Sequence, residues 1–183
     1  MSHVVERAPT GRAICRGCGA RIAAGEHRFG ERMPNPYGDD GSETTRWFHL
    51  ACAAFTRPEP FLETIATISE ETDGKDVLEQ EARLGVAHHR LPRVRAAERA
   101  PSGRAACRSC HQPIAKGAWR IALAYYEDGR FAPAGFIHVA CAAPYLETTA
   151  IVPRLTRFSP TLTDADVAEI QAELGTAPSQ RQE

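Results

Sequence analysis

The strongest constraint on this chain is an internal repeat that contains all six of its cysteines. Residues 6–15 read ERAPTGRAIC and residues 98–107 read ERAPSGRAAC, so eight of ten positions are identical at an offset of 92. The similarity continues through a Cys-x2-Cys pair and resumes, at an offset of 89, at a His-x2-Cys pair. Each copy closes with a pattern that predicts a helix, over residues 76–84 and 166–174. The chain therefore contains two copies of one domain of about 80 residues.

These landmarks define the predicted organisation of the chain. We predict a first domain over residues 1–85, a basic linker over 86–94, a second domain over 95–175 and a disordered polar tail over 176–183. Gly85 and Gly175 follow the predicted helices, and we expect both in the left-handed conformation common after a helix end. In the second copy, Thr163 and Asp166 are spaced to form a capping box.

The repeated cysteines and histidines have the spacing of metal ligands. The two sets read C-x2-C-x30-H-x2-C and C-x2-C-x27-H-x2-C. Two ligands separated by two residues can hold one ion from a tight turn, and two such pairs complete the tetrahedron that Zn²⁺ prefers. A site with four protein ligands has no place for a reactive water, so the predicted zinc is structural, and its removal should unfold the domain. We predict two Zn²⁺ ions, one per repeat, bound by Cys15, Cys18, His49 and Cys52 and by Cys107, Cys110, His138 and Cys141.

Two other uses of the cysteines stay open at this point. Disulfide bonds would leave the repeated histidines without a role, and the chain shows neither a secretion signal nor an apolar run of about 20 residues. We therefore expect an intracellular protein, in the cytoplasm or nucleoid of a bacterium or the nucleus of a eukaryote. In a cross-brace, the two Cys-x2-Cys pairs would share one ion and the two His-x2-Cys pairs the other. Because each repeat carries a complete ligand set, one ion per repeat is favoured.

Together these motifs resemble a known family of zinc fingers. They comprise Gly-Arg-x2-Cys-x2-Cys, an arginine ten residues after the second cysteine, about thirty residues to His-x2-Cys, and a closing acidic helix. This combination resembles the zinc fingers of poly(ADP-ribose) polymerases, which also occur at the front of a eukaryotic DNA ligase. The resemblance covers both repeats. It implies a small, zinc-stabilised α+β fold with two tandem fingers, each with a small antiparallel sheet, flanking helices and one zinc ion.

The resemblance also implies recognition of DNA strand breaks, such as nicks and ends, without sequence preference. The arginines that it assigns to phosphates are Arg12, Arg28, Arg104 and Arg120. Apolar side chains in the loop before the histidine would cap the exposed base pair, and the candidates are Tyr37 and Thr44 in finger 1 and Tyr126 and Phe131 in finger 2. Arg16 and Arg108, inside the Cys-x2-Cys pairs, would offset thiolate charge and are further DNA-binding candidates. Beside the ligands, the expected core residues are Trp47, Phe48, Phe136 and Ile137.

The net charge of −1 is uneven along the chain. Residues 58–84 hold two basic and eight acidic side chains, whereas residues 85–130 hold nine basic and three acidic ones. His88 and His89 lie in the basic linker and can add to a phosphate-facing stripe below neutral pH. Because phosphate binding needs clustered positive charge, we predict that finger 2 contributes more of the DNA affinity.

These observations predict a monomeric, non-enzymatic protein that binds broken DNA, has a role in repair and recruits a repair enzyme such as a ligase or nuclease. The alternative is a zinc-stabilised protein-interaction or RNA-binding module, favoured by the acidic stretch and the near-zero net charge. The sequence shows no acidic cluster at metal-ligand spacing, no Walker loop and no Lys-x-Asp-Gly motif of a ligase.

Overall fold

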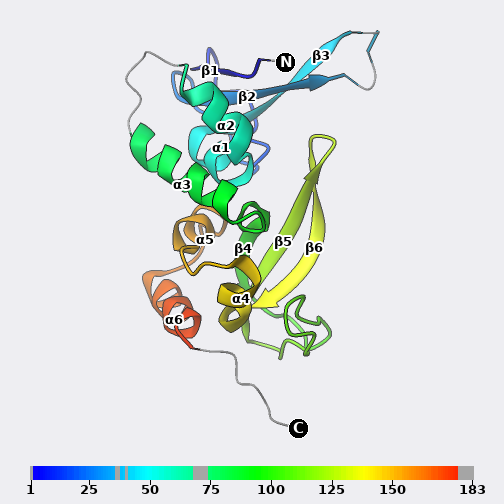
Figure 1. Cartoon of the computed structure of the whole chain (residues 1–183), viewed down its shortest axis with the longest axis vertical. Helices are drawn as coiled ribbons and strands as arrows, with labels where there is room; N and C mark the ends of the chain where they lie inside the picture. The colour runs from blue at the N-terminus through cyan, green and yellow to red at the C-terminus, as the bar shows by residue number, and fades with distance from the viewer. Residues whose placement is uncertain (1, 36–37, 40, 68–73, 177–183) are drawn as a thin grey trace. The chain divides into compact units, whose positions relative to one another are not determined.

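The computed structural model describes residues 2–35, 38–39, 41–67 and 74–176 (Figure 1). The chain divides into two compact units, Met1–Ala87 with Asp128–Arg130, and His88–Glu127 with Phe131–Glu183. Each unit contains a three-stranded antiparallel sheet with helices, which confirms the predicted small α+β fold. The tail predicted over residues 176–183 lies, apart from Thr176, outside the described residues. Among the helices described, none has the length and apolar character needed to cross a membrane.

Within its described residues, the first unit has a sheet of order β1-β2-β3 and three helices. Its elements are β1 (Val4–Arg7), β2 (His27–Pro34), β3 (Glu43–His49), α1 (Leu50–Thr56), α2 (Pro58–Ile65) and α3 (Lys75–Ala87). Alternate strand residues face opposite sides of a sheet, and one side of this sheet is covered by helices. Phe29 and Phe48 point to that side and pack with Phe61 of α2, and all three side chains are fully buried. This aromatic cluster lies in the core of the unit, together with the fully buried Ile22 and Ile65.

The second unit has the sheet order β4-β5-β6. Its elements are η1 (Leu91–Arg93), β4 (Val94–Arg99), β5 (Trp119–Glu127), β6 (Arg130–His138), η2 (Val139–Cys141), α4 (Ala142–Leu146), α5 (Val152–Phe158) and α6 (Asp164–Leu174). Ile121 of β5 and Ile137 of β6 are fully buried, as is Ile151 at the start of α5. The core of this unit contains these aliphatic side chains and the buried Trp119 of β5.

The helix ends differ in part from the prediction. Gly85 lies inside α3, which continues to Ala87, and Gly175 has a φ of −79°. The left-handed conformation predicted for both glycines is therefore wrong. Glycine occupies negative φ about as readily as positive φ, so it adopts the left-handed conformation only where the path of the chain requires it. The segment predicted as a linker, residues 86–94, contains the end of α3 and the 3₁₀ turn η1, and its Leu91 is fully buried.

The capping box at the start of α6 is confirmed. The Thr163 side chain accepts a hydrogen bond from the Asp166 backbone N–H at 3.2 Å, and the Thr163 backbone N–H donates to Asp166 Oδ2 at 2.9 Å. These bonds satisfy two donors that a helix start otherwise leaves unpaired. They also lower the pKa of the Asp166 carboxyl, since the hydroxyl and N–H of Thr163 stabilise its charged form.

Candidate metal centres and nucleic-acid interface

The Cys-x2-Cys pair of each unit lies in a tight turn closed by backbone hydrogen bonds. In the first unit, the N–H of Cys15 donates to the Ala20 carbonyl at 2.8 Å, and the N–H of Gly19 donates back to the Cys15 carbonyl at 2.9 Å. Gly19 needs a left-handed φ of +76° to make this turn. His111 takes the same role in the second unit, with a φ of +61° and a 2.9 Å bond to the Cys107 carbonyl.

The His-x2-Cys pair of each unit lies where a strand ends and a helical turn begins. His49 is the last residue of β3 and Cys52 lies in the first turn of α1. His138 is the last residue of β6 and Cys141 lies in η2. Residues three apart lie on one side of a helical turn, so both side chains of each pair face the Cys-x2-Cys turn.

The four predicted ligands of each unit are brought together, and their ligand atoms all lie within 4.8 Å of one another. Cys18 Sγ lies 3.4 Å and Cys52 Sγ 4.0 Å from Nδ1 of His49. The corresponding separations in the second unit are 3.4 and 3.8 Å. A tetrahedron with Zn–S bonds near 2.3 Å and Zn–N bonds near 2.05 Å has S···N separations of about 3.6 Å. Each group could therefore hold one metal ion, and the separations suit zinc.

The second nitrogen of each histidine fixes the orientation of the ring. Nε2 of His49 lies 3.2 Å from the Arg21 carbonyl, and Nε2 of His138 lies 3.3 Å from the Pro113 carbonyl. A carbonyl can only accept, so Nε2 carries the proton and Nδ1 keeps its lone pair for the metal. Both histidines are therefore prepared as Nδ1 ligands.

The thiol groups show why these clusters need a cation. A hydrogen bond from the Cys52 thiol lowers the pKa of Cys15 to about 3. Burial, together with repulsion from Cys107, raises the pKa of Cys141 to about 12. Within such a cluster, ionisation of one thiol opposes ionisation of its neighbours, and a positive charge between the sulfurs favours the ionised forms. A bound Zn²⁺ would supply that charge and would cross-link the turn to the strand end.

The backbone of the first turn approaches the opposite ligand closely at Gly17. A Cβ at this position would lie 2.5 Å from Cβ of Cys52 and 3.3 Å from its Sγ. The second unit has Ser109 at the matching position, and its backbone N–H donates to Cys107 Sγ at 3.4 Å. The first site thus depends on a glycine that the second site does not need.

The two centres also differ in exposure. His49 is buried, with 7% of its surface exposed. Cys15 and Cys52 are also buried, and Cys18 is half-buried. In the second unit Cys110 is exposed and His138 is half-buried. Solvent and chelators therefore reach the second centre more readily.

Arg28 and Arg120, assigned to phosphates by resemblance, are buried and ion-paired with glutamates that are partly exposed. Arg28 Nε and Nη2 donate to Glu6 Oε1 at 3.1 and 2.5 Å, and the guanidinium lies 3.5 Å from the centroid of the Trp47 ring. Arg120 pairs in the same way with Glu98, and stacks on Phe136 with 3.6 Å to the ring centroid. Both arginines are less than 9% exposed. Their recurrence therefore has a structural reason: each ties the first strand of its sheet to the strand that ends in the histidine ligand.

The rings under these arginines are matched to the residue on the neighbouring strand. Trp47 pairs with Gly30, where a Cβ would lie 2.7 Å from the tryptophan ring. The second copy combines the smaller ring of Phe136 with Ala122 at the position of the glycine. Both rings are half-buried on the face away from the core, so the core assignment of Trp47 and Phe136 is wrong. Strand alternation is the reason, because their neighbours Phe48 and Ile137 take the inward positions and are fully buried, as predicted.

The remaining predicted arginines lie exposed around the two turns. Arg12 and Arg104 precede the first cysteine of each set, and Arg16 and Arg108 follow it. All four side chains are exposed, and within the described parts of the chain none forms an ion pair or a side-chain hydrogen bond. Each unit therefore presents, beside its metal centre, two exposed arginines that have no carboxylate partner among the described residues.

The predicted base-capping residues have different surroundings. Tyr126 and Phe131 are half-buried and contact each other, with ring centroids 4.8 Å apart, and the Arg95 guanidinium lies 4.0 Å from the Phe131 centroid. Thr44 is half-buried within β3 rather than in a loop. Tyr37 lies outside the described residues.

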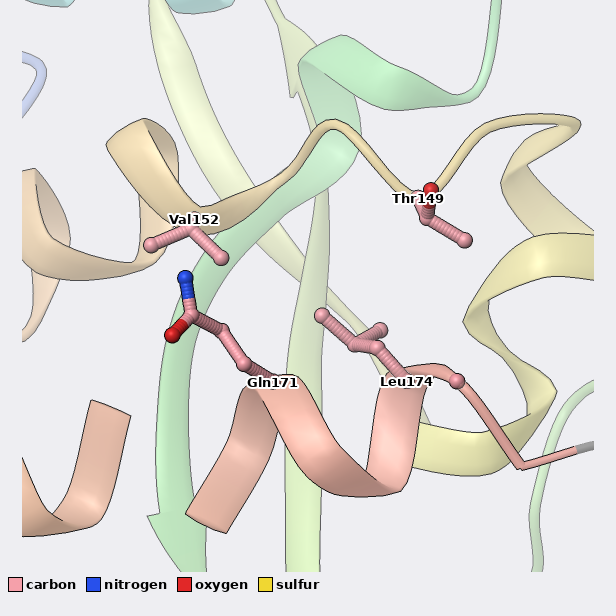
Figure 2. A pocket seen from close by; sticks show the side chains of 5 residues that line it. Thr149, Val152, Gln171 and Leu174 are labelled. Atoms are coloured by element: carbon pink, nitrogen blue, oxygen red, sulfur yellow. The ribbon is translucent and has the colours of Figure 1, made fainter. Parts of the chain in front are cut away.

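A small hollow of about 260 Å³ lies in the second unit between the segment before α5 and the end of α6 (Figure 2). Its lining residues are Thr149, Val152, Gln171, Leu174 and Gly175. Ligand sites are usually larger, at about 300–1,000 Å³, and this lining offers no titratable group. The exposed surfaces beside the metal centres are therefore the stronger candidates for function.

Two small α+β units, each built around a closed Cys3His group, define a protein of metal-stabilised fingers. Residues 6–89 match the sequence model of the family described as the poly(ADP-ribose) polymerase and DNA-ligase Zn-finger region. The match covers most of the first unit and confirms the resemblance to these zinc fingers seen in the sequence. The second Cys3His group, within residues 107–141, fits a tandem arrangement of the same kind of finger.

Proposed function

We propose that this protein binds DNA at strand breaks through its two zinc fingers, without reading base sequence, and acts in DNA repair inside the cell. The observation that carries the proposal is the pair of exposed arginines beside each metal centre, which have no carboxylate partner among the described residues, in a chain whose residues 6–89 match this zinc-finger family. Arginine donates two parallel hydrogen bonds to phosphate oxygens, and such contacts do not depend on the bases. Thiolates bound to zinc stay reduced in an intracellular setting.

Arg12 and Arg16 in the first unit, and Arg104 and Arg108 in the second, are the proposed phosphate ligands. Arg28 and Arg120 have a positioning role, because each holds together the strands of the sheet that ends at the histidine ligand. This division assigns a contact role to exposed arginines and a positioning role to buried ones. It also predicts that the four exposed arginines, and not the buried pair, set the salt dependence of binding.

The contacting rings of Tyr126 and Phe131 are the proposed means of detecting the break. An aromatic ring can cover the face of a base pair only where the stack is interrupted, and such stacking is worth about 1–3 kcal/mol per base. Arg95 and Tyr126 already contact Phe131, so they would hold its ring in a fixed orientation. Phosphate contacts alone would bind any duplex, whereas this ring pair would add preference for a break.

Variants of single residues test this division of roles on a nicked duplex and its intact counterpart. Arg104→Gln should weaken binding to both duplexes by a similar factor. Arg99→Gln is the matched control, because Arg99 is ion-paired with Glu169 at 2.5 Å, and it should leave both affinities nearly unchanged. Phe131→Ala should mainly lower the preference for the nick. Equal effects of the two arginine variants would overturn the assignment of Arg104.

The alternative, a protein-interaction or RNA-binding module, finds less support on the described surface. The exposed apolar side chains of α3 are Val77 and Val86, at 62% and 46% exposure. They lie nine residues apart, so at about 100° per residue they point to opposite sides of the helix and form no single patch. Zinc-loaded protein that bound single-stranded RNA but no DNA would favour the alternative.

A further inference from the structure

The arginines of the described chain fall into two groups according to how their charge is held. One group is neutralised by carboxylates, in the pairs Arg28–Glu6, Arg57–Glu31, Arg83–Glu79, Arg99–Glu169 and Arg120–Glu98. Arg90 and Arg93 belong to the other group. Their partners are aromatic rings and neutral oxygens, so their positive charge remains available to an anion.

The turn η1 places these two arginines on one side. The N–H of Arg93 donates to the Arg90 carbonyl at 3.1 Å, which closes a single 3₁₀ turn. Residues three apart are eclipsed in a 3₁₀ helix and lie about 6 Å apart along its axis. Leu91 between them is fully buried, so it anchors the turn in the second unit. The two arginines therefore form a fixed pair rather than two mobile side chains.

An aromatic ring and a neutral oxygen hold each guanidinium. The Arg90 guanidinium lies 5.0 Å from the centroid of the Tyr145 ring, and its Nη1 donates to the Tyr145 carbonyl at 3.1 Å. The Arg93 guanidinium lies 4.6 Å from the Tyr125 ring centroid, and its Nη1 lies 3.4 Å from the tyrosine hydroxyl. Stacking on a ring fixes the plane of a guanidinium and leaves most of its five N–H donors unused. No carboxylate among the residues described lies within ion-pair distance of either arginine.

We infer that Arg90 and Arg93 form a second phosphate-binding site, separate from the arginines beside the metal centres. The inference rests on the proposed DNA-binding function and extends it to the segment that begins the second unit. Its ligand is the phosphate backbone of one DNA strand, since phosphates repeat every 3.4 Å along the helix axis and both guanidinium groups keep N–H donors that could each bind a phosphate oxygen. Arg90 and Arg93 both lie in the second unit, so the site adds positive charge to the second finger. It supplies a structural cause for unequal affinity of the two fingers.

The salt dependence of DNA binding tests this site. The double variant Arg90→Gln/Arg93→Gln removes two phosphate contacts, so the slope of log K against log salt should become less steep by about 1.8, on nicked and intact duplexes alike. The variant Arg90→Lys/Arg93→Lys keeps both charges and should retain the slope. Arg99→Gln is the matched control. Arg99 also stacks on a ring, 4.1 Å from the Trp119 centroid, but its charge is neutralised by Glu169, so its loss should not change the slope. Zinc content of two ions per chain and an unchanged circular dichroism spectrum verify that each variant is folded.

The possible results separate the inference from the function on which it rests. An unchanged slope in the glutamine variant, with wild-type protein that binds DNA, overturns the second site and leaves the proposed function in place. A slope that falls equally in the lysine and glutamine variants also overturns it, because the side chains would then act through structure rather than charge. Wild-type protein that binds neither duplex overturns both proposals.

Discussion

Replacing Glu6 by alanine tests whether Arg28 belongs to a structural ion pair. The two hydrogen bonds from Arg28 to Glu6 measure 3.1 and 2.5 Å, and the side chain of Arg28 is 9% exposed. Hydrogen bonds to a charged group contribute about 1.5–3 kcal/mol, and their loss would leave a buried charge without a partner. The Glu6 side chain is 41% exposed, so water offsets part of that loss. We expect the free energy of unfolding of the first unit to fall by about 2 kcal/mol.

Urea unfolding of the zinc-saturated protein measures this change. A Trp119→Phe background leaves Trp47 as the only tryptophan, so its fluorescence reports on the first unit. Glu63→Ala, at an exposed position of α2, is the matched control and should change stability by less than about 0.5 kcal/mol. Adding Arg28→Met to Glu6→Ala should restore most of the lost stability, because an apolar side chain needs no ionic partner. Equal unfolding free energies for Glu6→Ala and Glu63→Ala would refute the structural role of the pair.

Three further perturbations have defined outcomes. Gly17→Ala places a Cβ 2.5 Å from that of Cys52, so the first centre should bind zinc more weakly in chelator competition, with a stability loss of about 1–3 kcal/mol; unchanged zinc affinity would contradict the close approach. A chromophoric chelator should remove zinc from the second centre first, because Cys110 is exposed, and simultaneous release would contradict this order. Thr163→Ala should lower the unfolding free energy of the second unit by about 1 kcal/mol, since the cap to Asp166 is lost, whereas Thr163→Ser should retain it.

The metal centres could be predicted from the sequence because their geometry is local. A Cys-x2-Cys turn and a His-x2-Cys pair each bring two ligands to one side within a few residues, so spacing alone defines the halves of the site. Because each repeat contains one pair of each kind, the repeat indicated which Cys-x2-Cys pair shares an ion with which His-x2-Cys pair. Nothing in the spacing could show that the second centre is the more exposed one, because exposure of Cys110 depends on packing in three dimensions.

The roles of the arginines could not be predicted in the same way. Glu6 and Arg28 are 22 residues apart, and only the antiparallel register of β1 and β2 places them opposite each other. The recurrence of a glutamate together with this arginine, as Glu98 and Arg120, was the signal in the sequence for a paired role. For Arg90 and Arg93 the sequence showed a basic segment, but the rings that hold them come from β5 and α4, far along the chain.

The most direct test of the account compares the affinity of the zinc-loaded wild-type protein for a nicked duplex and for the same duplex without the nick, at physiological salt. Stacking on one exposed base pair at about 1–3 kcal/mol predicts a dissociation constant about 5- to 150-fold lower for the nicked duplex. Equal affinities for the two duplexes would contradict break recognition, even if both bind tightly.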